Sequence, residues 1–274
     1  MTSTTKTESA VVAAGAVVVP LFDYLLRLAD SDLVLAQRLG EWVGKGPVIE
    51  EDIALTNVGL DLIGQARLWY GYAGEVEARF AGKGRSEDEL AFLRDSPAYR
   101  NLQLVEQPNG SYADTMARQF YFDQWHLRVL DALAASRDAR IAAIAAKAVK
   151  EVAYHAERSV DWLVRLGDGT DESHARMQAA LDDLWPYTGE MFAVDTLEQS
   201  LIDAGVAADV AALQPSWQAA VAAACAEGTL RLPPGTWMQG GGHRGGKQGV
   251  HTEHLGRLLA EMQFLQRAYP GAVW

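Results

Sequence analysis

Four predicted helices carry polar side chains at helical spacing among apolar residues, and these side chains could do chemistry. Residues three or four positions apart lie on one face of a helix, so each set forms a narrow polar stripe. The stripes consist of Arg27, Asp30 and Gln37, with Asp32 close by; Asn57, Asp61 and Gln65; Gln119, Asp123 and His126; and Lys147, Glu151 and His155. Carboxylates and imidazoles that face one another inside a four-helix bundle are the ligands of di-iron proteins. The stripes therefore indicate either a metal centre or the remains of one.

The stripes lack the paired motif that a di-iron centre needs. Bundles of that class use a Glu-x-x-His pair on each of two helices. Here Asp61 is followed by Gly64 at the histidine position, and His155 is preceded by Val152 at the carboxylate position. Glu151 misses the carboxylate position by one residue, which moves it by about 100° around the helix. Neither pair is intact.

A third helix keeps the spacing in Asp123-x-x-His126, but this pair stands alone and has aspartate in place of glutamate. The degenerate di-iron positions are Asp32, Asp61, Gly64, Asp123, Val152 and His155. Breaking a buried ion pair costs about 3–5 kcal/mol, so a buried Asp61 needs a partner. We predict no catalytic or metal-binding residue, but a buried polar network in which the Lys147 ammonium balances Asp61; its members are Asp61, Asp123, Lys147, Glu151 and His155. The alternative is an active di-iron oxidase with a non-standard site built from Asp32, Asp61, Asp123, Glu151 and His155.

The apolar pattern predicts an all-α protein, a ferritin-like four-helix bundle with a long crossover and extra C-terminal helices. The core helices are expected over residues 22–42, 50–73, 112–135 and 139–166. The second of them is apolar on almost every side, with Ile53 and Leu60 among its residues, which is typical of a helix in the middle of a bundle. Residues 82–110, with a short helix at 90–94, form the crossover. Further helices are expected over 171–192, bent at Pro186, and over 197–204, 215–227 and 252–268.

Residues 1–20 are predicted to be a disordered N-terminal extension, and residues 21–274 a single ferritin-like helical domain. The apolar run from Ala10 to Val19 faintly resembles the core of a signal peptide. Glu8 lies just before that run, and Pro20 leads directly into an amphipathic helix, so the sequence favours an extension.

The composition excludes several classes of partner. The 274-residue chain has a formal net charge of −12 and a pI near 4.9, which argue against nucleic acid and anionic membranes. No window approaches the roughly 20 apolar residues that a membrane span needs. Cys225 is the only cysteine, so no internal disulfide can form, which suits a reducing compartment. We expect a cytoplasmic protein.

The glycine-rich segment over residues 235–249 contains Gly241 to Lys247, which satisfies G-x-x-x-x-G-K. A phosphate-binding loop has Ser or Thr next, whereas this chain has Gln248, and no buried strand precedes the segment. It is expected to be a surface loop. The residues in it that could contact an acidic partner surface or a CoA phosphate are His243, Arg244 and Lys247. His251 and His254, which flank Glu253, are expected to cap and pack the last helix.

Five long runs of this sequence resemble the C subunits of bacterial phenylacetyl-CoA ring 1,2-epoxidases, the multicomponent phenylacetate monooxygenases. The runs are RLADSDLVLAQRLGEW, ALTNVGLDLIGQAR, VEQPNGSYADTMARQF, AKAVKEVAYH and GVHTEHLGRLLAEMQFLQR. The resemblance covers nearly everything from Leu21 to Trp274 and leaves the first twenty residues outside. For this family it implies a ferritin-like subunit without a metal centre of its own.

The resemblance also implies a partner and a reaction. The partner is a homologous A subunit, which has intact Glu-x-x-His pairs, carries the di-iron site and binds the CoA thioester. A reductase subunit supplies electrons for the NADPH- and O2-dependent epoxidation of phenylacetyl-CoA in aerobic phenylacetate degradation. We therefore expect a non-catalytic structural subunit without a cofactor, in a homodimer or a hetero-oligomer. A free-standing acidic scaffold or CoA-binding module remains a second alternative.

Overall fold

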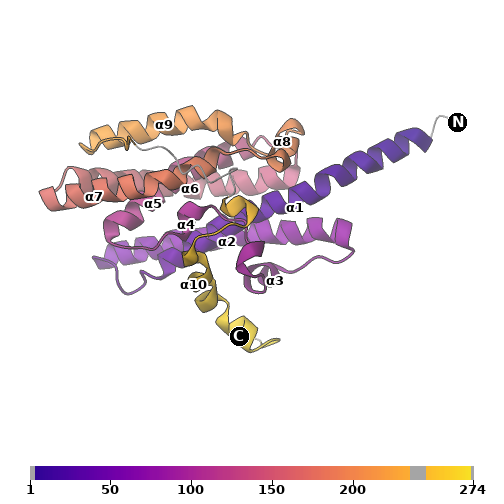
Figure 1. The fold of residues 1–274 in the computed structure, drawn as a ribbon, viewed down its shortest axis with the longest axis horizontal. Helices are drawn as coiled ribbons and strands as arrows, with labels where there is room; N and C mark the ends of the chain where they lie inside the picture. Colours follow the sequence, from indigo (N-terminus) through magenta and orange to yellow (C-terminus); the bar gives the residue numbers. More distant parts are fainter. Residues whose placement is uncertain (1–3, 235–244, 273–274) are drawn as a thin grey trace.

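The computed structural model describes residues 4–234 and 245–272, and these residues form helices and connections without a strand. Four long helices make the core, namely α1 (Thr4–Gly40), α2 (Ile49–Ala81), α5 (Tyr112–Leu133) and α6 (Ala139–Gly167). They pack as two hairpins, α1 with α2 and α5 with α6 (Figure 1). The all-α, ferritin-like bundle predicted from the sequence is confirmed.

The hairpins bury their apolar faces against one another. Leu35 of α1, Trp69 of α2 and Val152 of α6 are all fully buried. Burying a side chain of this size stabilises a fold by about 1.5–3 kcal/mol. The expectation that α2 is buried on almost every side is wrong, because Ile53 and Leu60 are 55% and 59% exposed. Part of the apolar face of α2 is therefore exposed, because no other segment in the described part of the chain covers it.

The core helices begin and end at residues with suitable capping chemistry. The carboxylate of Asp138 accepts hydrogen bonds from the backbone N–H groups of Arg140 and Ile141, which starts α6. Ser111 and Asp114 form a capping box at the start of α5. α2 ends at Gly82, whose φ of 76° lies in the left-handed region that favours glycine.

The long crossover between the hairpins contains α3 (Glu87–Phe92), the short 3-10 helix η1 (Ser96–Ala98) and α4 (Gln103–Glu106). A buried ion pair joins it to α1. The guanidinium of Arg94 donates to both carboxylate oxygens of Asp30, and the hydroxyl of Tyr70 donates to the same carboxylate. The backbone N–H of Arg100 adds a fourth hydrogen bond at 2.7 Å. Asp30 therefore positions the crossover and has no free role in a metal site.

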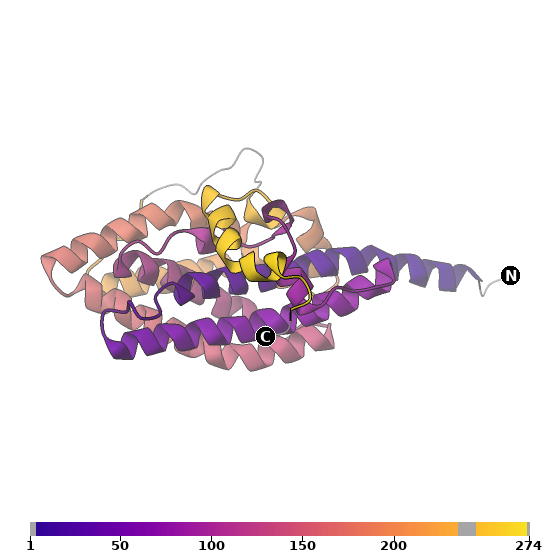
Figure 2. The ribbon, with the colours of Figure 1, turned by 90° about the horizontal axis from the view of Figure 1, so that it is seen from below.

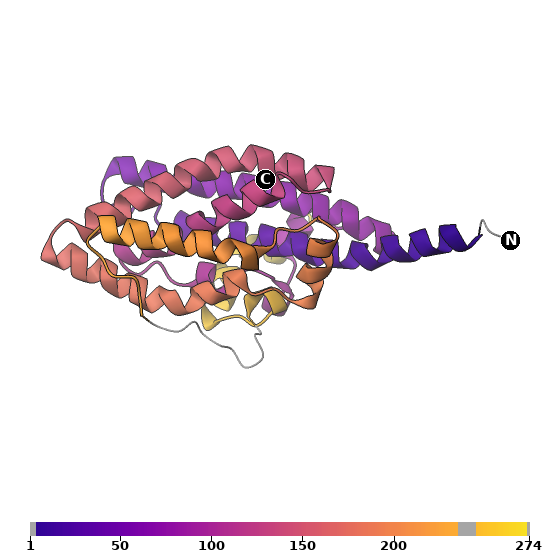
Figure 3. The same cartoon turned by 90° about the horizontal axis from the view of Figure 1, so that it is seen from above.

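A second layer covers the α5–α6 hairpin. It consists of α7 (Asp171–Leu184), η2 (Trp185–Phe192), α8 (Thr196–Asp203) and α9 (Val210–Glu227), and α9 lies along α5 and α6 (Figure 3). Trp217 is fully buried, and its indole N–H donates to the Tyr121 carbonyl at 3.1 Å. The bend predicted at Pro186 is the change from α7 to η2. Cys225 is buried, as expected of a small apolar side chain.

The C-terminal part contains η3 (Gly246–Gln248), α10 (Glu253–Met262) and α11 (Phe264–Ala268). These helices lie across the crossover (Figure 2). The last helix, which the sequence predicts as continuous over 252–268, is thus divided near Gln263. Gln263 explains the break, because its buried amide donates to the carbonyls of Ala91 and Arg94 in the crossover.

The first helix is longer than the sequence predicts. α1 begins at Thr4 and passes through Pro20, so it includes most of the segment expected to be a disordered extension. Its N-terminal part projects beyond the bundle (Figure 1). No helix within residues 4–234 and 245–272 is both long and apolar enough to cross a membrane.

Candidate functional site

The polar stripes of α2 and α6 meet along the line where these helices pack. His155 Nε2 lies 3.0 Å from Asp61 Oδ2, and Gln65 donates to Glu151 at 3.1 Å. The His155 side chain is fully buried, whereas that of Asp61 is 40% exposed. Burial lowers the pKa of His155, the Asp61 carboxylate opposing this shift. Each of these four residues thus has a partner on the facing helix.

The stripes of α1 and α5 meet deeper in the core. His126 Nε2 lies 3.5 Å from Asp32 Oδ1, and Gln119 donates to Asp123 at 2.6 Å. Burial raises the pKa of Asp123 to about 8 and that of Asp32 well above its usual value. Burial also lowers the pKa of His126 to about 3. For each of these groups burial therefore favours the uncharged form.

The residues present do not fit a di-iron centre. An added Cβ at Gly64 would meet nothing within 4 Å, and the fully buried Val152 offers no ligand atom. Asp61 and His155 use their ligand atoms on each other. Among the residues that the structure describes, no three or more His, Cys, Asp or Glu side chains are arranged to hold a metal ion. The arrangement forms hydrogen bonds between facing helices and lacks the paired Glu-x-x-His motif of a di-iron centre.

Lys147 is not part of this network, which corrects the sequence prediction. Its side chain is exposed on the outer face of α6, and His155 takes the place predicted for it beside Asp61. Lys147 and His155 are eight residues apart, so they differ by about 80° around the helix. The Asp123 carboxyl belongs to the deeper group instead, with Gln119. His126 also lies in the core, and its three-residue spacing from Asp123 was the signal that could have placed it there.

The partner loop predicted from the glycine-rich segment is only partly described. His243 and Arg244 lie outside the described residues. Lys247 is 5% exposed, and its ammonium donates to both carboxylate oxygens of Glu198 at 2.8 Å. The Arg27 guanidinium lies 3.1 Å from the same carboxylate. Lys247 therefore ties η3 to α8 and α1 and is not available to a partner, because a buried counter-charge holds it.

His251, which was expected to cap and pack the last helix, packs against the crossover. His251 is buried, with Nδ1 2.5 Å from Glu106 Oε1 and Nε2 3.1 Å from the Tyr99 carbonyl oxygen. Thr252 gives its backbone N–H and its hydroxyl to Glu106 at 2.8 and 2.6 Å. Its hydroxyl makes no capping hydrogen bond to α10 and instead joins the start of that helix to α4. His251 is a packing residue.

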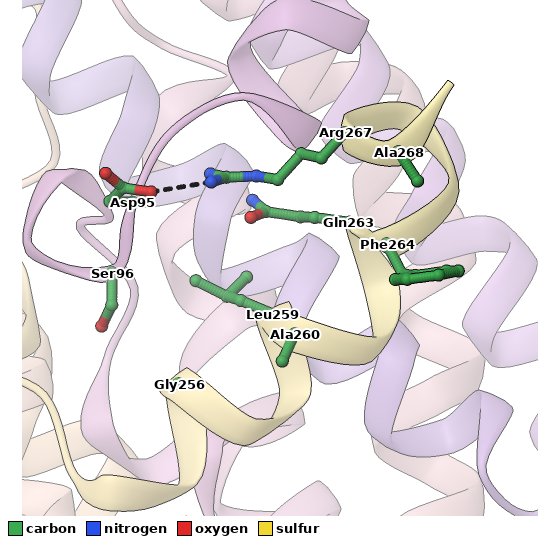
Figure 4. A pocket seen from close by; sticks show the side chains of 9 residues that line it. All are labelled: Asp95, Ser96, Gly256, Leu259, Ala260, Gln263, Phe264, Arg267 and Ala268. Atoms are coloured by element: carbon green, nitrogen blue, oxygen red, sulfur yellow. Dashed lines mark hydrogen bonds and ion pairs between the residues drawn. The ribbon is translucent and has the colours of Figure 1, made fainter. Parts of the chain in front are cut away.

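A surface hollow of about 500 Å³ lies beside α10 and α11, apart from the polar core. It is lined by Asp95, Ser96, Gly256, Leu259, Ala260, Gln263, Phe264, Arg267 and Ala268 (Figure 4). Arg267 pairs with Asp95 at 2.9 Å and donates to two crossover carbonyls, so its charge and donors are already engaged. These contacts attach the C-terminal helices to the crossover and leave no free charged group for a ligand.

Two comparisons with known proteins match almost the whole chain. Residues 5–274 match the family model described as phenylacetic acid catabolic protein. A curated relative, the C subunit of the 1,2-phenylacetyl-CoA epoxidase of Escherichia coli (strain K12), is 51% identical over 251 residues. That match covers 92% of this chain and 98% of the relative. The chain belongs to the phenylacetic acid catabolic protein family.

Proposed function

We propose that this chain is the non-catalytic structural subunit of a phenylacetyl-CoA 1,2-epoxidase complex. It supports a homologous catalytic subunit, which carries the di-iron centre, and it needs no cofactor of its own. The identity of 51% to the C subunit of such an epoxidase, over nearly the whole length of that relative, supports the assignment to the complex. A cytoplasmic location belongs to the same proposal, because the single cysteine suits a reducing compartment.

The loss of two ligand positions, at Gly64 and Val152, is the observation that supports the non-catalytic role. The Asp61 side chain is partly exposed to solvent, and its carboxylate forms a hydrogen bond with His155. Burial favours the protonated form of the Asp32 and Asp123 carboxyl groups. A catalytic di-iron site needs a Glu-x-x-His pair on each of two helices, and this chain has Gly64 at one histidine position and Val152 at one carboxylate position. The four core helices keep the arrangement of a di-iron bundle, but two of the ligand positions no longer carry ligand residues.

Reconstitution tests the proposal. This chain, the catalytic subunit and the reductase are purified separately, and NADPH- and O2-dependent conversion of phenylacetyl-CoA is measured for each combination. We expect turnover only when this chain and the catalytic subunit are both present. Full turnover by the catalytic subunit without this chain would overturn the supporting role. Turnover by this chain with the reductase alone would establish the rival reading, an active oxidase with a non-standard metal site.

A variant separates support from chemistry within the same assay. Asp61→Asn combined with His155→Gln keeps the size and hydrogen-bonding capacity of the pair and removes both titrating groups. Because the pair touches no reacting atom in this proposal, the complex should keep its turnover within about twofold. Loss of turnover in a variant that still folds and binds the catalytic subunit would show that the pair takes part in the reaction.

The second rival, a free-standing CoA-binding module, loses one of its supports. The basic residues of the glycine-rich segment were the candidates for a CoA phosphate site. Lys247 is buried against Glu198, so its charge is already neutralised. Retention of this chain on immobilised CoA without the catalytic subunit would nevertheless revive that reading.

A further inference from the structure

The connection between α4 and α5 contains Asn109-Gly110, the only Asn-Gly pair in the chain. An asparagine in this context can lose its side-chain amide. The backbone nitrogen of the following residue attacks Cγ, ammonia leaves, and water opens the resulting succinimide to aspartate or isoaspartate. A following glycine favours the attack, because it has no side chain to hinder the approach. Gly110 is exposed, so water reaches this connection.

The amide of Asn109 is held at both of its ends. Its nitrogen donates to the Arg38 carbonyl at 2.7 Å and to the Glu41 carboxylate at 2.9 Å. Its oxygen accepts from the Arg118 guanidinium at 2.7 Å. Two of these three contacts are with charged groups, and such hydrogen bonds are the strong ones. They restrict the rotation that would bring Cγ to the Gly110 nitrogen.

The surroundings of the amide nitrogen also oppose its departure. A leaving amide must take up a proton to become ammonia. The Arg38 carbonyl is an acceptor only, and so is an ionised Glu41 carboxylate, which means that neither group supplies that proton. The native contacts therefore hinder the last step of ring formation as well as the first.

Arg118 makes the hold on the amide oxygen a firm one. Its side chain is 1% exposed, and both of its hydrogen bonds go to uncharged oxygens, the Gln107 carbonyl at 2.5 Å and Asn109 Oδ1. Burial lowers the pKa of Arg118 to about 9, and the nearby Arg38 acts in the same direction. A buried cation of this kind is costly without its hydrogen bonds, so Arg118 and Asn109 hold each other in place.

We propose that Asn109 is a deamidation site that the native fold keeps closed and that unfolding opens. Loss of ammonia is irreversible, so a modified Asn109 marks a chain that has been unfolded. Arg118 and Glu41 are the positioning residues of this site. The proposal does not depend on the proposed function, because it concerns this chain alone.

Peptide mass spectrometry compares the modification in native and unfolded chains. The whole protein is incubated at one slightly alkaline pH and one temperature, with and without concentrated guanidinium chloride. Asn109 should be modified at least about a hundredfold more slowly in the native chain, since about 1.4 kcal/mol for each of its two contacts with charged groups corresponds to a factor of ten. The unfolded chain should modify Asn109 before Asn57 and Asn101, which precede Val58 and Leu102. Equal rates in the two states, or an unmodified Asn109 in the unfolded chain, would overturn the proposal.

A substitution at the edge of the site tests the contact itself. Glu41→Ala removes one partner of the amide nitrogen, and the Glu41 side chain is 40% exposed and pairs with Arg38 on its own helix. Native Glu41→Ala should modify Asn109 about tenfold faster than the wild type, the factor that corresponds to about 1.4 kcal/mol. An unchanged or slower rate would overturn the role of this contact.

Glu172→Ala is the matched control. It also removes an exposed carboxylate that pairs with an arginine on its own helix, Arg176 in α7, but this pair does not involve Asn109. The control should modify Asn109 at the wild-type rate, and both variants should match the wild type in guanidinium chloride. If the control accelerated the reaction as much as Glu41→Ala does, a general loss of stability would explain the effect and the proposed hold would be wrong.

Discussion

Raising the pH from 6.5 to 8 should destabilise this fold, because its core holds a protonated carboxyl group. Burial raises the pKa of Asp123 to about 8, whereas an unfolded aspartate titrates near about 3.9. Between these values the native state keeps a proton that the unfolded state has lost, so the free energy of unfolding falls as the pH rises. One pK unit corresponds to about 1.4 kcal/mol, so Asp123 alone accounts for a loss on the order of 1–2 kcal/mol between pH 6.5 and 8. The raised pKa of Asp32 acts in the same direction.

Two buried histidines act with the opposite sign below pH 6.5. Burial lowers the pKa of His126 to about 3, so the unfolded state binds a proton that the native state excludes. His126 therefore removes stability as the pH falls below its unfolded pKa of about 6.5. The lowered pKa of His155 adds to this loss. Below pH 6.5 the two histidines therefore oppose the stability that Asp123 and Asp32 still add as the pH falls, so the net change in stability should be smaller there than between pH 6.5 and 8.

Urea unfolding monitored by circular dichroism at half-unit pH steps measures this profile. Asp123→Asn is the control, because it keeps the hydrogen bond from Gln119 and removes the titrating group. In this variant the free energy of unfolding should fall less between pH 6.5 and 8 than in the wild type. The fall that remains should come from Asp32. Constant or rising stability of the wild type over this range would refute the reasoning. So would an unchanged slope in the Asn variant.

Two further substitutions test the buried ion pairs. Arg94→Met should cost about 3–5 kcal/mol, since it leaves the Asp30 carboxylate in the core without its cation. This loss corresponds to a fall of about 5–9 °C in the thermal midpoint, and adding Asp30→Asn should recover much of it. Lys247→Met should cost about 3 kcal/mol, the low end of the same range, because Arg27 still lies beside Glu198. Calorimetry measures both, and a shift within about 1 °C for either would show that the pair contributes little.

The bundle could be predicted from the sequence because helical period, turn residues and the length of the crossover are local signals. The neighbours of each polar residue could not, because they depend on the rotation of each helix within the bundle. Lys147 and His155 are spaced as on one helical stripe, yet the rotation of about 80° that accumulates over eight residues places Lys147 in solvent. The contacts of Lys247 could not be predicted either, because they involve a residue distant in the sequence. Its glycine-rich surroundings favour an exposed loop, whereas a carboxylate 49 residues earlier buries it.

Other differences have the same origin. The apolar residues of α2 predict a fully buried helix, and the structure leaves Ile53 and Leu60 exposed, because a pattern along one helix does not reveal how many neighbours surround it. By contrast, the lost ligand positions Gly64 and Val152 could be identified from the sequence alone. Their spacing was readable without neighbours, because the di-iron motif is defined within a single helix.

Metal analysis after anaerobic loading tests the central claim most directly, that this core has kept the shape of a di-iron site and lost its ligands. The isolated chain is incubated with excess Fe(II), passed through a desalting column and analysed for iron, and its absorption is followed on exposure to air. The account predicts no stoichiometric iron and no oxo-bridge absorption band. Two irons per chain, with that band appearing in air, would contradict it.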